Sequence, residues 1–378
     1  MRVAIVTESF LPSVNGVTNS VLRILDTLKS QGHEAMVIAP TAPGHNYLDY
    51  PVIQTPSVLL AGFPVAIPTS SVARALDSFR PDILHAAAPF WLGGYAIAHA
   101  AKRGTASVAV YQTDVAGYMA RYGLDFAAPM LDAATAAIHK PATLTLAPTP
   151  DGVEYLTGLG LANVRQWGRG VDTELFSPAK KTSAGARDLR RRVAPSGERI
   201  IGYVGRLAPE KQVERMKELV NIPNTQILLV GDGPSAPHLQ DIFRGDNVVF
   251  AGRLGGADLA DAYGAMDVFV HCGTEETFGQ TIQEAHASGL PVIAPEKGGQ
   301  RHLIRPGVDG YLVDHRQWGA FREKVEEILA GPQLLAWLSA NATRAVQGKT
   351  WQANNEKLLD HYEHALSRTH QGTMATVA

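Results

Sequence analysis

The chain has 378 residues, enough for two domains of ordinary size, and its 45% hydrophobic and 19% charged residues are typical of a globular protein, neither disordered nor fibrous. A formal net charge of −2 gives no overall positive field, so we expect no nucleic-acid partner. The one cysteine, Cys272, excludes an internal disulfide and fits a reducing, cytoplasmic compartment.

Short apolar runs alternate with helical periodicity from the first residues onward, which predicts βαβ units and parallel sheets. The opening apolar run is too short for a signal peptide and predicts a buried strand. Val21, Ile24, Leu25 and Leu28 have the spacing of one buried helix face. In the first half we expect strands at Val3–Val6, Ala35–Ala39, Ile83–His85, Val108–Tyr111, Thr143–Ala147 and Val164–Trp167.

Two uncharged stretches raise the question of a membrane. Ile83–Ala101 is 19 residues long, near the length of a spanning helix, but Pro89 and a Gly pair favour a strand, a loop and a helix. Val52–Ala73 contains three prolines, which exclude a continuous helix and predict a loop. Its apolar part, Val58–Pro68, either contacts lipid or packs on its own domain.

A polar, basic segment follows, which we interpret as a linker at residues 173–199. Its Arg190–Arg192 run either meets anionic lipid or belongs to a solvated helix face. A second series then predicts strands at Ile200–Gly205, Ile227–Gly231, Val248–Ala251, Val268–Val270, Val292–Ala294 and Tyr311–Val313. Helical segments follow around Phe321–Leu329 and Trp351–Leu366, and a polar end at 369–378 indicates a flexible tail.

The two series predict two Rossmann-like, doubly wound α/β domains, at 1–172 and 200–350. Ligands of such sheets bind at the carboxyl ends of the strands, so two of these domains facing a cleft would suit an enzyme with two substrates.

One candidate site follows the first strand of the second series. Gly205 ends this strand, and Arg206 and Lys211 come after it near a helix start, where two cations and free N–H groups suit a pyrophosphate. An ordinary pair of surface cations is the alternative. The loop before Gly16 also lets a backbone approach an anion, but the chain has neither a GxGxxG fingerprint nor a P-loop.

Glu276 and Glu284 lie eight positions apart, at the start of a helix that Phe278 and Gly279 precede. Eight residues of helix separate them by on the order of 12 Å. Glycosidase carboxylates lie about 5–9.5 Å apart, so this spacing suits instead a long ligand with a sugar at one end and a ribose at the other. The alternative is an exposed Glu284 and a Glu276 that stabilises the helix dipole.

The stretch "EETFGQTIQEAHASGLPVIAPEKGG" resembles the E-x7-E signature of glycosyltransferase family 4, which comprises retaining enzymes of the GT-B fold. The resemblance extends over nearly the whole chain, through "LPSVNGVTNSVLRILDTLKSQGHEAMVIAP", "RPDILHAAAPFWLG", "GYVGRLAPEKQ" and "LLVGDGP". The "YQTD" and "GRGVD" segments are most similar to lipid-directed α-mannosyltransferases that use GDP-mannose.

The resemblance implies an acceptor domain at 1–172, a nucleotide-sugar donor domain at 200–350, and a helix at 351–368 that crosses back to the N-terminal domain. It implies that Arg206 and Lys211 neutralise the donor diphosphate, that Glu276 contacts the donor sugar and that Glu284 binds the ribose. The other donor-binding residues that it implies are Gly16, Gln112, Gly205, Thr277, Phe278, Gly279 and Gln280. The family is metal-independent, so we expect neither metal nor cofactor.

One position departs from the family pattern, because Gln112 stands where many members have His. Glutamine does not titrate, so it can only hydrogen-bond the sugar. Asp114, two residues on, either binds a donor hydroxyl or the attacking group of the acceptor, or is structural.

These inferences predict a retaining hexosyltransferase that moves mannose from GDP-mannose onto a glycolipid, peripherally bound at the cytoplasmic face of an anionic membrane. The first alternative keeps the class and uses UDP-glucose or UDP-sulfoquinovose. The second is a GT-B hydrolase or epimerase acting on the nucleotide sugar, which the E-x7-E context disfavours.

Overall fold

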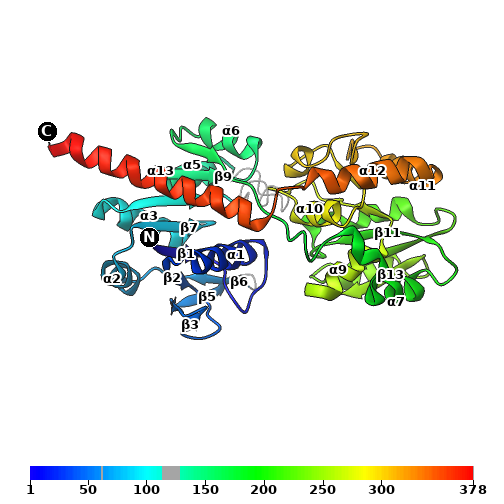
Figure 1. Ribbon diagram of the computed structural model, residues 1–378, viewed down its shortest axis with the longest axis horizontal. Coiled ribbons are helices and arrows are strands. Elements are labelled where there is room, and N and C mark those ends of the chain that lie inside the picture. Colours follow the sequence, from blue (N-terminus) through cyan, green and yellow to red (C-terminus); the bar gives the residue numbers. More distant parts are fainter. Residues whose placement is uncertain (61–62, 113–127, 378) are drawn as a thin grey trace. The chain divides into compact units, whose positions relative to one another are not determined.

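The computed structural model describes residues 1–60, 63–112 and 128–377, and it divides into two compact units (Figure 1). Unit 1 comprises Met1–Arg169 and Trp351–Ala378, and unit 2 comprises Gly170–Thr350. Among the described residues, no helix is long and apolar enough to cross a membrane.

Unit 1 is built on a sheet in which all pairs are parallel except the last one. Its strands are β1 (Arg2–Thr7), β2 (Glu34–Ala39), β3 (Asn46–Tyr47), β4 (Tyr50–Gln54), β7 (Ile83–Ala87), β8 (Ala106–Val110), β9 (Leu144–Ala147) and β10 (Val164–Gln166). The order of these described strands is β10-β9-β8-β7-β1-β2-β4-β3, with β3 antiparallel to β4. The strands predicted for the first half are confirmed.

Helices cover both faces of this sheet. The described helices of unit 1 are α1 (Gly16–Ser30), α2 (Ser70–Phe79), α3 (Trp91–Arg103), α5 (Ala128–His139), α6 (Pro150–Gly158) and α13 (Trp351–Val377). Successive residues of β1 point to opposite faces. Val3 and Ile5 therefore pack with α1 and α13, whereas Ala4 and Val6 pack with α2 and α3. The predicted stripe of α1 is buried.

Unit 2 has a fully parallel sheet of the order β13-β12-β11-β14-β15-β16 among its described strands. These are β11 (Arg199–Val204), β12 (Thr225–Val230), β13 (Val248–Gly252), β14 (Val268–Val270), β15 (Val292–Pro295) and β16 (Gly310–Val313). Its α-helices are α7 (Ala184–Val193), α8 (Ala236–Ile242), α9 (Gly256–Ala265), α10 (Gln280–Ala287), α11 (Ala320–Ala330) and α12 (Pro332–Ala345). The 3₁₀ turns are η2 (Pro178–Thr182), η3 (Pro209–Lys211), η4 (Val213–Leu219) and η5 (Gly299–His302).

The interpretation of residues 173–199 as a linker was wrong. These residues include η2 and α7, which belong to unit 2 and pack against α9. Ala186 and Val193 of α7 are buried, and Arg190 pairs with Asp267 at 2.8 Å.

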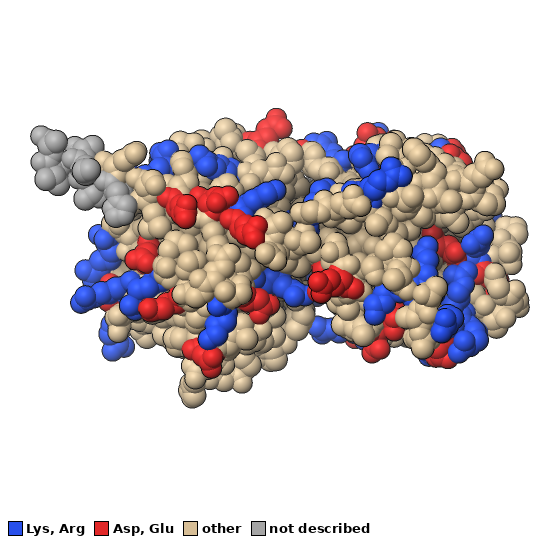
Figure 2. Space-filling view, viewed as in Figure 1, with Lys and Arg blue, Asp and Glu red and all other residues tan. Residues whose placement is uncertain are grey.

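The basic run of α7 is a mixed-charge face. Arg191 and Arg192 both pair with Asp188 at 3.1 Å. Blue and red side chains are accordingly interspersed over unit 2 in Figure 2. This pairing favours the solvated helix face over the lipid contact for this run.

Two further segments differ from their predictions. The stretch 52–73, expected to be a loop, contains the end of β4, the start of α2 and an antiparallel hairpin of β5 (Ser57–Leu60) and β6 (Phe63–Ala66). The end of the chain, expected to be a flexible tail from 369, continues α13 as far as Val377.

Both sheets have a point at which the chain reverses the direction of strand addition. In unit 2 the chain adds β12 and β13 on one side of β11 and then returns to place β14 on the other side. In unit 1 the corresponding neighbours are β1 and β7. Loops at the carboxyl ends of such strand pairs are the usual place for ligands in open parallel sheets.

Candidate active site

The switch point of unit 2 brings together three residues singled out from the sequence. Arg206 and Lys211 follow β11, and Glu276 follows β14, the strand hydrogen-bonded to it. The ammonium of Lys211 lies 2.7 Å from Oε2 of Glu276, with both side chains about one-fifth exposed. The two loops therefore form one site.

The charge of Lys211 is firmly held. Burial acts to lower the pKa of its ammonium, but the charge and hydrogen bond of Glu276, with Glu210 and Glu275 nearby, raise it overall. Lys211 is therefore a cation at neutral pH, and its pairing with Glu276 offsets the cost of burying both groups.

Arg206 lies on the same loop and is 43% exposed. Its Nη1 is 3.7 Å from Oε1 of Glu210, and the hydroxyl of buried Tyr203 donates to its backbone carbonyl. The backbone of Arg206 is thus held in place, while its side chain is partly exposed to solvent. Gly231, after β12, approaches so closely that a Cβ there would overlap the carbonyl of Gly205, which explains the glycine of the "GDG" turn.

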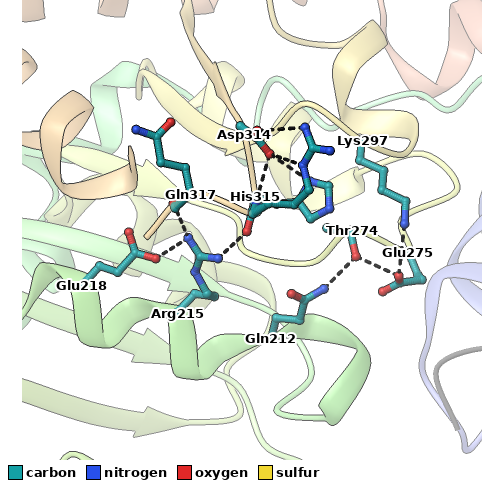
Figure 3. Close-up of polar contacts among 10 residues, drawn as sticks. Gln212, Arg215, Glu218, Thr274, Glu275, Lys297, Asp314, His315 and Gln317 are labelled. Carbon is teal, nitrogen blue, oxygen red and sulfur yellow. Dashed lines mark hydrogen bonds and ion pairs between the residues drawn. The ribbon is translucent and has the colours of Figure 1, made fainter. Parts of the chain in front are cut away.

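A chain of polar contacts supports the loop that carries Glu276. Gln212 donates to the hydroxyl of Thr274 at 2.7 Å, and Thr274 donates to Glu275 at 2.8 Å. Lys297 approaches Glu275 at 3.8 Å. Figure 3 shows these contacts running from Gln212 to Lys297. The loop is therefore anchored on both sides before α10 begins.

The start of α10 completes the predicted donor site. Gly279 is its N-cap, in the left-handed region with φ of 105°, and Phe278 before it is buried. Thr277 precedes them in the same loop, and Gln280, the first residue of α10, donates to the backbone carbonyl of Gly170 at 3.1 Å. Backbone N–H groups at a helix start are suited to an anion.

Glu284 lies one turn further along α10, in different surroundings from Glu276. Its Oε2 accepts a hydrogen bond from Tyr263 at 3.0 Å, and Tyr263 is fully buried on α9. Burial raises the pKa of Glu284 to about 7, against hydrogen bonds from Tyr263 and Gln280 that lower it. The two glutamates thus differ: Glu276 pairs with a lysine, whereas Glu284 is a buried carboxyl whose pKa lies near neutrality.

The predicted residues of unit 1 form a second group. Gln112 follows β8 and is buried, and its Oε1 accepts a hydrogen bond from Arg169 at 2.7 Å. A Cβ added to Gly16 would lie 2.6 Å from Nη1 of the same arginine. Gly16 and Gln112 are therefore both adjacent to Arg169. Asp114 lies outside the described residues.

Three residues with no predicted role emerge at these strand ends. Arg169 was visible only as the centre of "WGRGVD". Glu8, which follows β1, accepts from the backbone N–H groups of Phe90 and Gly93 at 2.9 and 3.0 Å, and burial raises its pKa. His271 follows β14, next to Glu276. For all three, the available signal was a polar residue at or shortly after the end of a predicted strand.

Chemically, the unit 2 group combines two cations, a helix start and two carboxylates. Two cations and helix N–H groups can hold a diphosphate, and carboxylates can accept hydrogen bonds from hydroxyls. This combination suits a ligand with a diphosphate between two hydroxyl-bearing groups.

Comparison with known proteins agrees with this chemistry. Residues 14–175 match the family model described as Glycosyltransferase Family 4, and residues 186–345 match that of Glycosyl transferases group 1. The chain is 43% identical to a GDP-mannose-dependent alpha-mannosyltransferase of Corynebacterium glutamicum, an alignment that covers 96% of this chain and 88% of that protein. It is 30% identical to a sulfoquinovosyl transferase of Arabidopsis thaliana, covering 94% of this chain and 70% of that protein.

A solved structure shows the same fold. The sucrose-phosphate synthase of Thermosynechococcus elongatus superposes with a TM-score of 0.79 at 22% identity, covering 97% of this chain and 99% of that one. The family and fold class inferred from the motifs are thereby confirmed. With both halves matched and a relative at 43% identity over nearly its full length, the chain belongs to glycosyltransferase family 4 and is a glycosyltransferase of the GT-B fold.

Proposed function

We propose that this enzyme transfers an α-mannosyl residue from GDP-mannose, with retention, onto a glycolipid at the cytoplasmic face of a membrane. The observation that carries the proposal is the grouping of Arg206, Lys211 and Glu276 at the ends of β11 and β14. The donor follows from identity: 43% to a relative named for GDP-mannose, against 30% to one named for sulfoquinovosyl transfer.

In this proposal the donor diphosphate lies against Arg206, Lys211 and the start of α10. Breaking the bond between the sugar C1 and the diphosphate oxygen leaves negative charge on the diphosphate. Cations and N–H groups that are already in place stabilise such charge most effectively. The step needs no metal in this scheme, because the two side chains supply the positive charge.

Glu276 and Glu284 bind the two ends of the donor. Glu276 accepts hydrogen bonds from hexose hydroxyls once Lys211 turns to the diphosphate, and Glu284 accepts them from the ribose diol. The acceptor hydroxyl attacks C1 on the face that the diphosphate leaves, and its proton passes to the departing phosphate oxygen. Such front-face attack requires no enzyme nucleophile, which agrees with a glutamine at position 112.

For the acceptor side, the β5–β6 hairpin supports a membrane contact. Adjacent strand residues point to opposite faces, yet Val58 and Leu59 are 51% and 78% exposed. Both faces of β5 are therefore open at this point, while Ala66 anchors the base of β6 in the core. Exposed apolar side chains that project in this way suit a lipid surface.

Calorimetric titration with GDP, UDP and ADP in the presence of EDTA tests the donor. We expect selective GDP binding, followed by mannose transfer from GDP-mannose to a membrane lipid extract. Selective UDP binding would overturn the mannosyl donor in favour of UDP-glucose or UDP-sulfoquinovose. Hydrolysis of GDP-mannose without any mannosylated lipid would favour a hydrolase.

A further inference from the structure

His271 is a buried histidine whose hydrogen-bonding capacity is unused. It directly follows β14 and is 2% exposed. Within the described part of the chain, neither Nδ1 nor Nε2 has a hydrogen-bond partner. Buried polar atoms are nearly always hydrogen-bonded, so a side chain with two such atoms needs a partner from elsewhere.

The ring faces the pair of residues assigned to the donor. Nε2 lies 3.8 Å from Oε2 of Glu276, the oxygen that accepts from Lys211 at 2.7 Å. This separation exceeds a hydrogen bond. The backbone N–H of His271 donates to the carbonyl of Ile293, which fixes the start of the loop.

Its protonation state suits hydroxyl recognition. Burial lowers the pKa of His271 to about 4, with Glu276 raising it and Lys211 lowering it. The ring is therefore neutral at pH 7, with one donor and one acceptor nitrogen. A sugar hydroxyl can likewise both donate and accept a hydrogen bond, so it can pair with either ring nitrogen.

A second buried side chain nearby also has a polar atom without a hydrogen-bond partner among the described residues. Gln300 of η5 is fully buried, and its Nε2 donates to the carbonyl of Gly273, two residues after His271. Its Oε1 has no partner among the described residues. His271, which lies in the segment before Glu276, and Gln300, which contacts that segment, thus both have unpartnered polar atoms. This is expected where a ligand supplies the missing hydrogen-bond partners.

We propose that His271 is a specificity-determining residue that hydrogen-bonds a hydroxyl of the donor hexose beside Glu276. This inference rests on the proposed function, which places the hexose at Glu276. When Lys211 turns to the diphosphate, Glu276 and the neutral imidazole remain as neighbouring groups for sugar hydroxyls. A site built to hydrogen-bond a hydroxyl discriminates strongly against analogues that lack it.

His286 on α10 provides a matched control. It is also buried, burial lowers its pKa to about 4, and its Nε2 has no hydrogen-bond partner among the described residues. Its charged neighbours, however, are Asp309, Lys349 and Arg305. Replacing His286 therefore reports the cost of losing a buried imidazole in unit 2 away from the Lys211–Glu276 pair.

The test compares His271→Phe, His271→Gln and His286→Phe in the full chain. Wild-type affinity for GDP is measured first, and its absence would contradict the proposed function itself. We then expect His271→Phe to keep the Kd for GDP within about twofold but to lower kcat/KM for GDP-mannose by about 10-fold or more. His271→Gln should recover part of this loss. His286→Phe should leave both the Kd for GDP and kcat/KM for GDP-mannose close to their wild-type values.

Donor analogues that each lack one hydroxyl identify the contact. One deoxy analogue should be used equally well by wild type and His271→Gln or His271→Phe, because the hydroxyl that His271 binds is already missing. The inference is overturned if every analogue loses as much activity in the variants as GDP-mannose does, or if the variants weaken GDP and GDP-mannose equally. Should UDP be the preferred nucleotide, the same comparison with the UDP-hexose decides the role of His271.

Discussion

Lys211 and Glu276 are 65 positions apart in the chain, and their charged groups lie 2.7 Å from each other at the ends of two hydrogen-bonded strands. Such an ion pair is suited to a ligand that carries both a diphosphate and sugar hydroxyls, because each charged group can bind one part of it. In the proposed binding mode, the diphosphate replaces Glu276 as the partner of Lys211 and sugar hydroxyls replace Lys211 as the partner of Glu276, so neither charged group is left without a partner.

Lys211→Ala should reduce turnover by roughly 100-fold or more, because charge developing on the diphosphate loses a fixed cation. The measurement is kcat with GDP-mannose, alongside the Kd for GDP. Lys217→Ala is the matched control: this lysine lies on η4 and its ammonium contacts the carbonyl of Ile242 and a carboxylate oxygen of Asp246. A near wild-type rate for Lys211→Ala would remove the diphosphate role.

Glu284 should make stability depend on pH. Its folded pKa of about 7 is above the reference value of 4.5, so between these values the folded chain binds a proton that the unfolded chain lacks. Stability is therefore lost as pH rises through this window, by up to about 1.4 kcal/mol per pH unit for this group. Glu284→Gln should raise the melting temperature relative to wild type at pH 8, and the gain should shrink towards pH 5.

The control for this effect is Glu323→Gln, an exposed glutamate on α11. Its melting-temperature difference from wild type should vary little between the two pH values. An equal difference for Glu284→Gln at pH 5 and pH 8 would contradict the raised pKa. The same variant should weaken GDP binding at pH 8, where the wild-type carboxylate is ionised.

Gly16 and Arg169 should be coupled. A Cβ at position 16 would press on the guanidinium, and because this is the far end of a flexible side chain, Gly16→Ala should displace it from Gln112 at little cost in stability. If Arg169 assists the reaction, Gly16→Ala and Arg169→Ala should each lower kcat/KM. The double variant should lose no more than Arg169→Ala alone, whereas simple addition of the two losses would show that they act independently.

Most strands of the two sheets followed from the sequence because they are short apolar runs with turn residues at their ends, whereas β3 and β4 were not predicted. The grouping of Arg206, Lys211 and Glu276 followed for the same reason, since the carboxyl ends of neighbouring parallel strands meet at one edge. No role was predicted for Arg169 because its contact is long-range, and none for His271 because the sequence does not show that both its ring nitrogens lack a partner among the described residues. Gln112 is 57 positions from Arg169, and no local pattern records that pair.

Two elements were misjudged for physical reasons. The segment with α7 is rich in Arg and polar residues, which favours a solvated linker, but Ala186, Val193 and the Arg190–Asp267 pair dock it on unit 2. The β5–β6 hairpin contains Pro64, and proline in a strand is confined to edges and bulges. An isolated two-stranded ribbon accommodates it, a possibility that the uncharged stretch alone did not indicate.

Tyr362 of α13 should stabilise unit 1 through His85. Its hydroxyl lies 2.8 Å from Nδ1 of this fully buried histidine, whose pKa burial lowers to about 3. Tyr362→Phe leaves Nδ1 without that partner, so the free energy of unfolding should fall by about 1–2 kcal/mol in urea titrations. Tyr95→Phe, at a partly exposed site on α3, should change it by less than about 0.5 kcal/mol.

The β5–β6 hairpin should control binding to lipid vesicles. Leu59→Asp places a charge at an apolar position of the hairpin that is 78% exposed, so insertion into the interface loses apolar area and gains a desolvation cost. We expect co-sedimentation with anionic vesicles to fall about 10-fold or more, while the Kd for GDP stays unchanged. Leu48→Asp is the control, because it makes the same exchange at an exposed residue in the turn between β3 and β4. If both variants bind vesicles as the wild type does, the membrane contact lies elsewhere and the hairpin has another role.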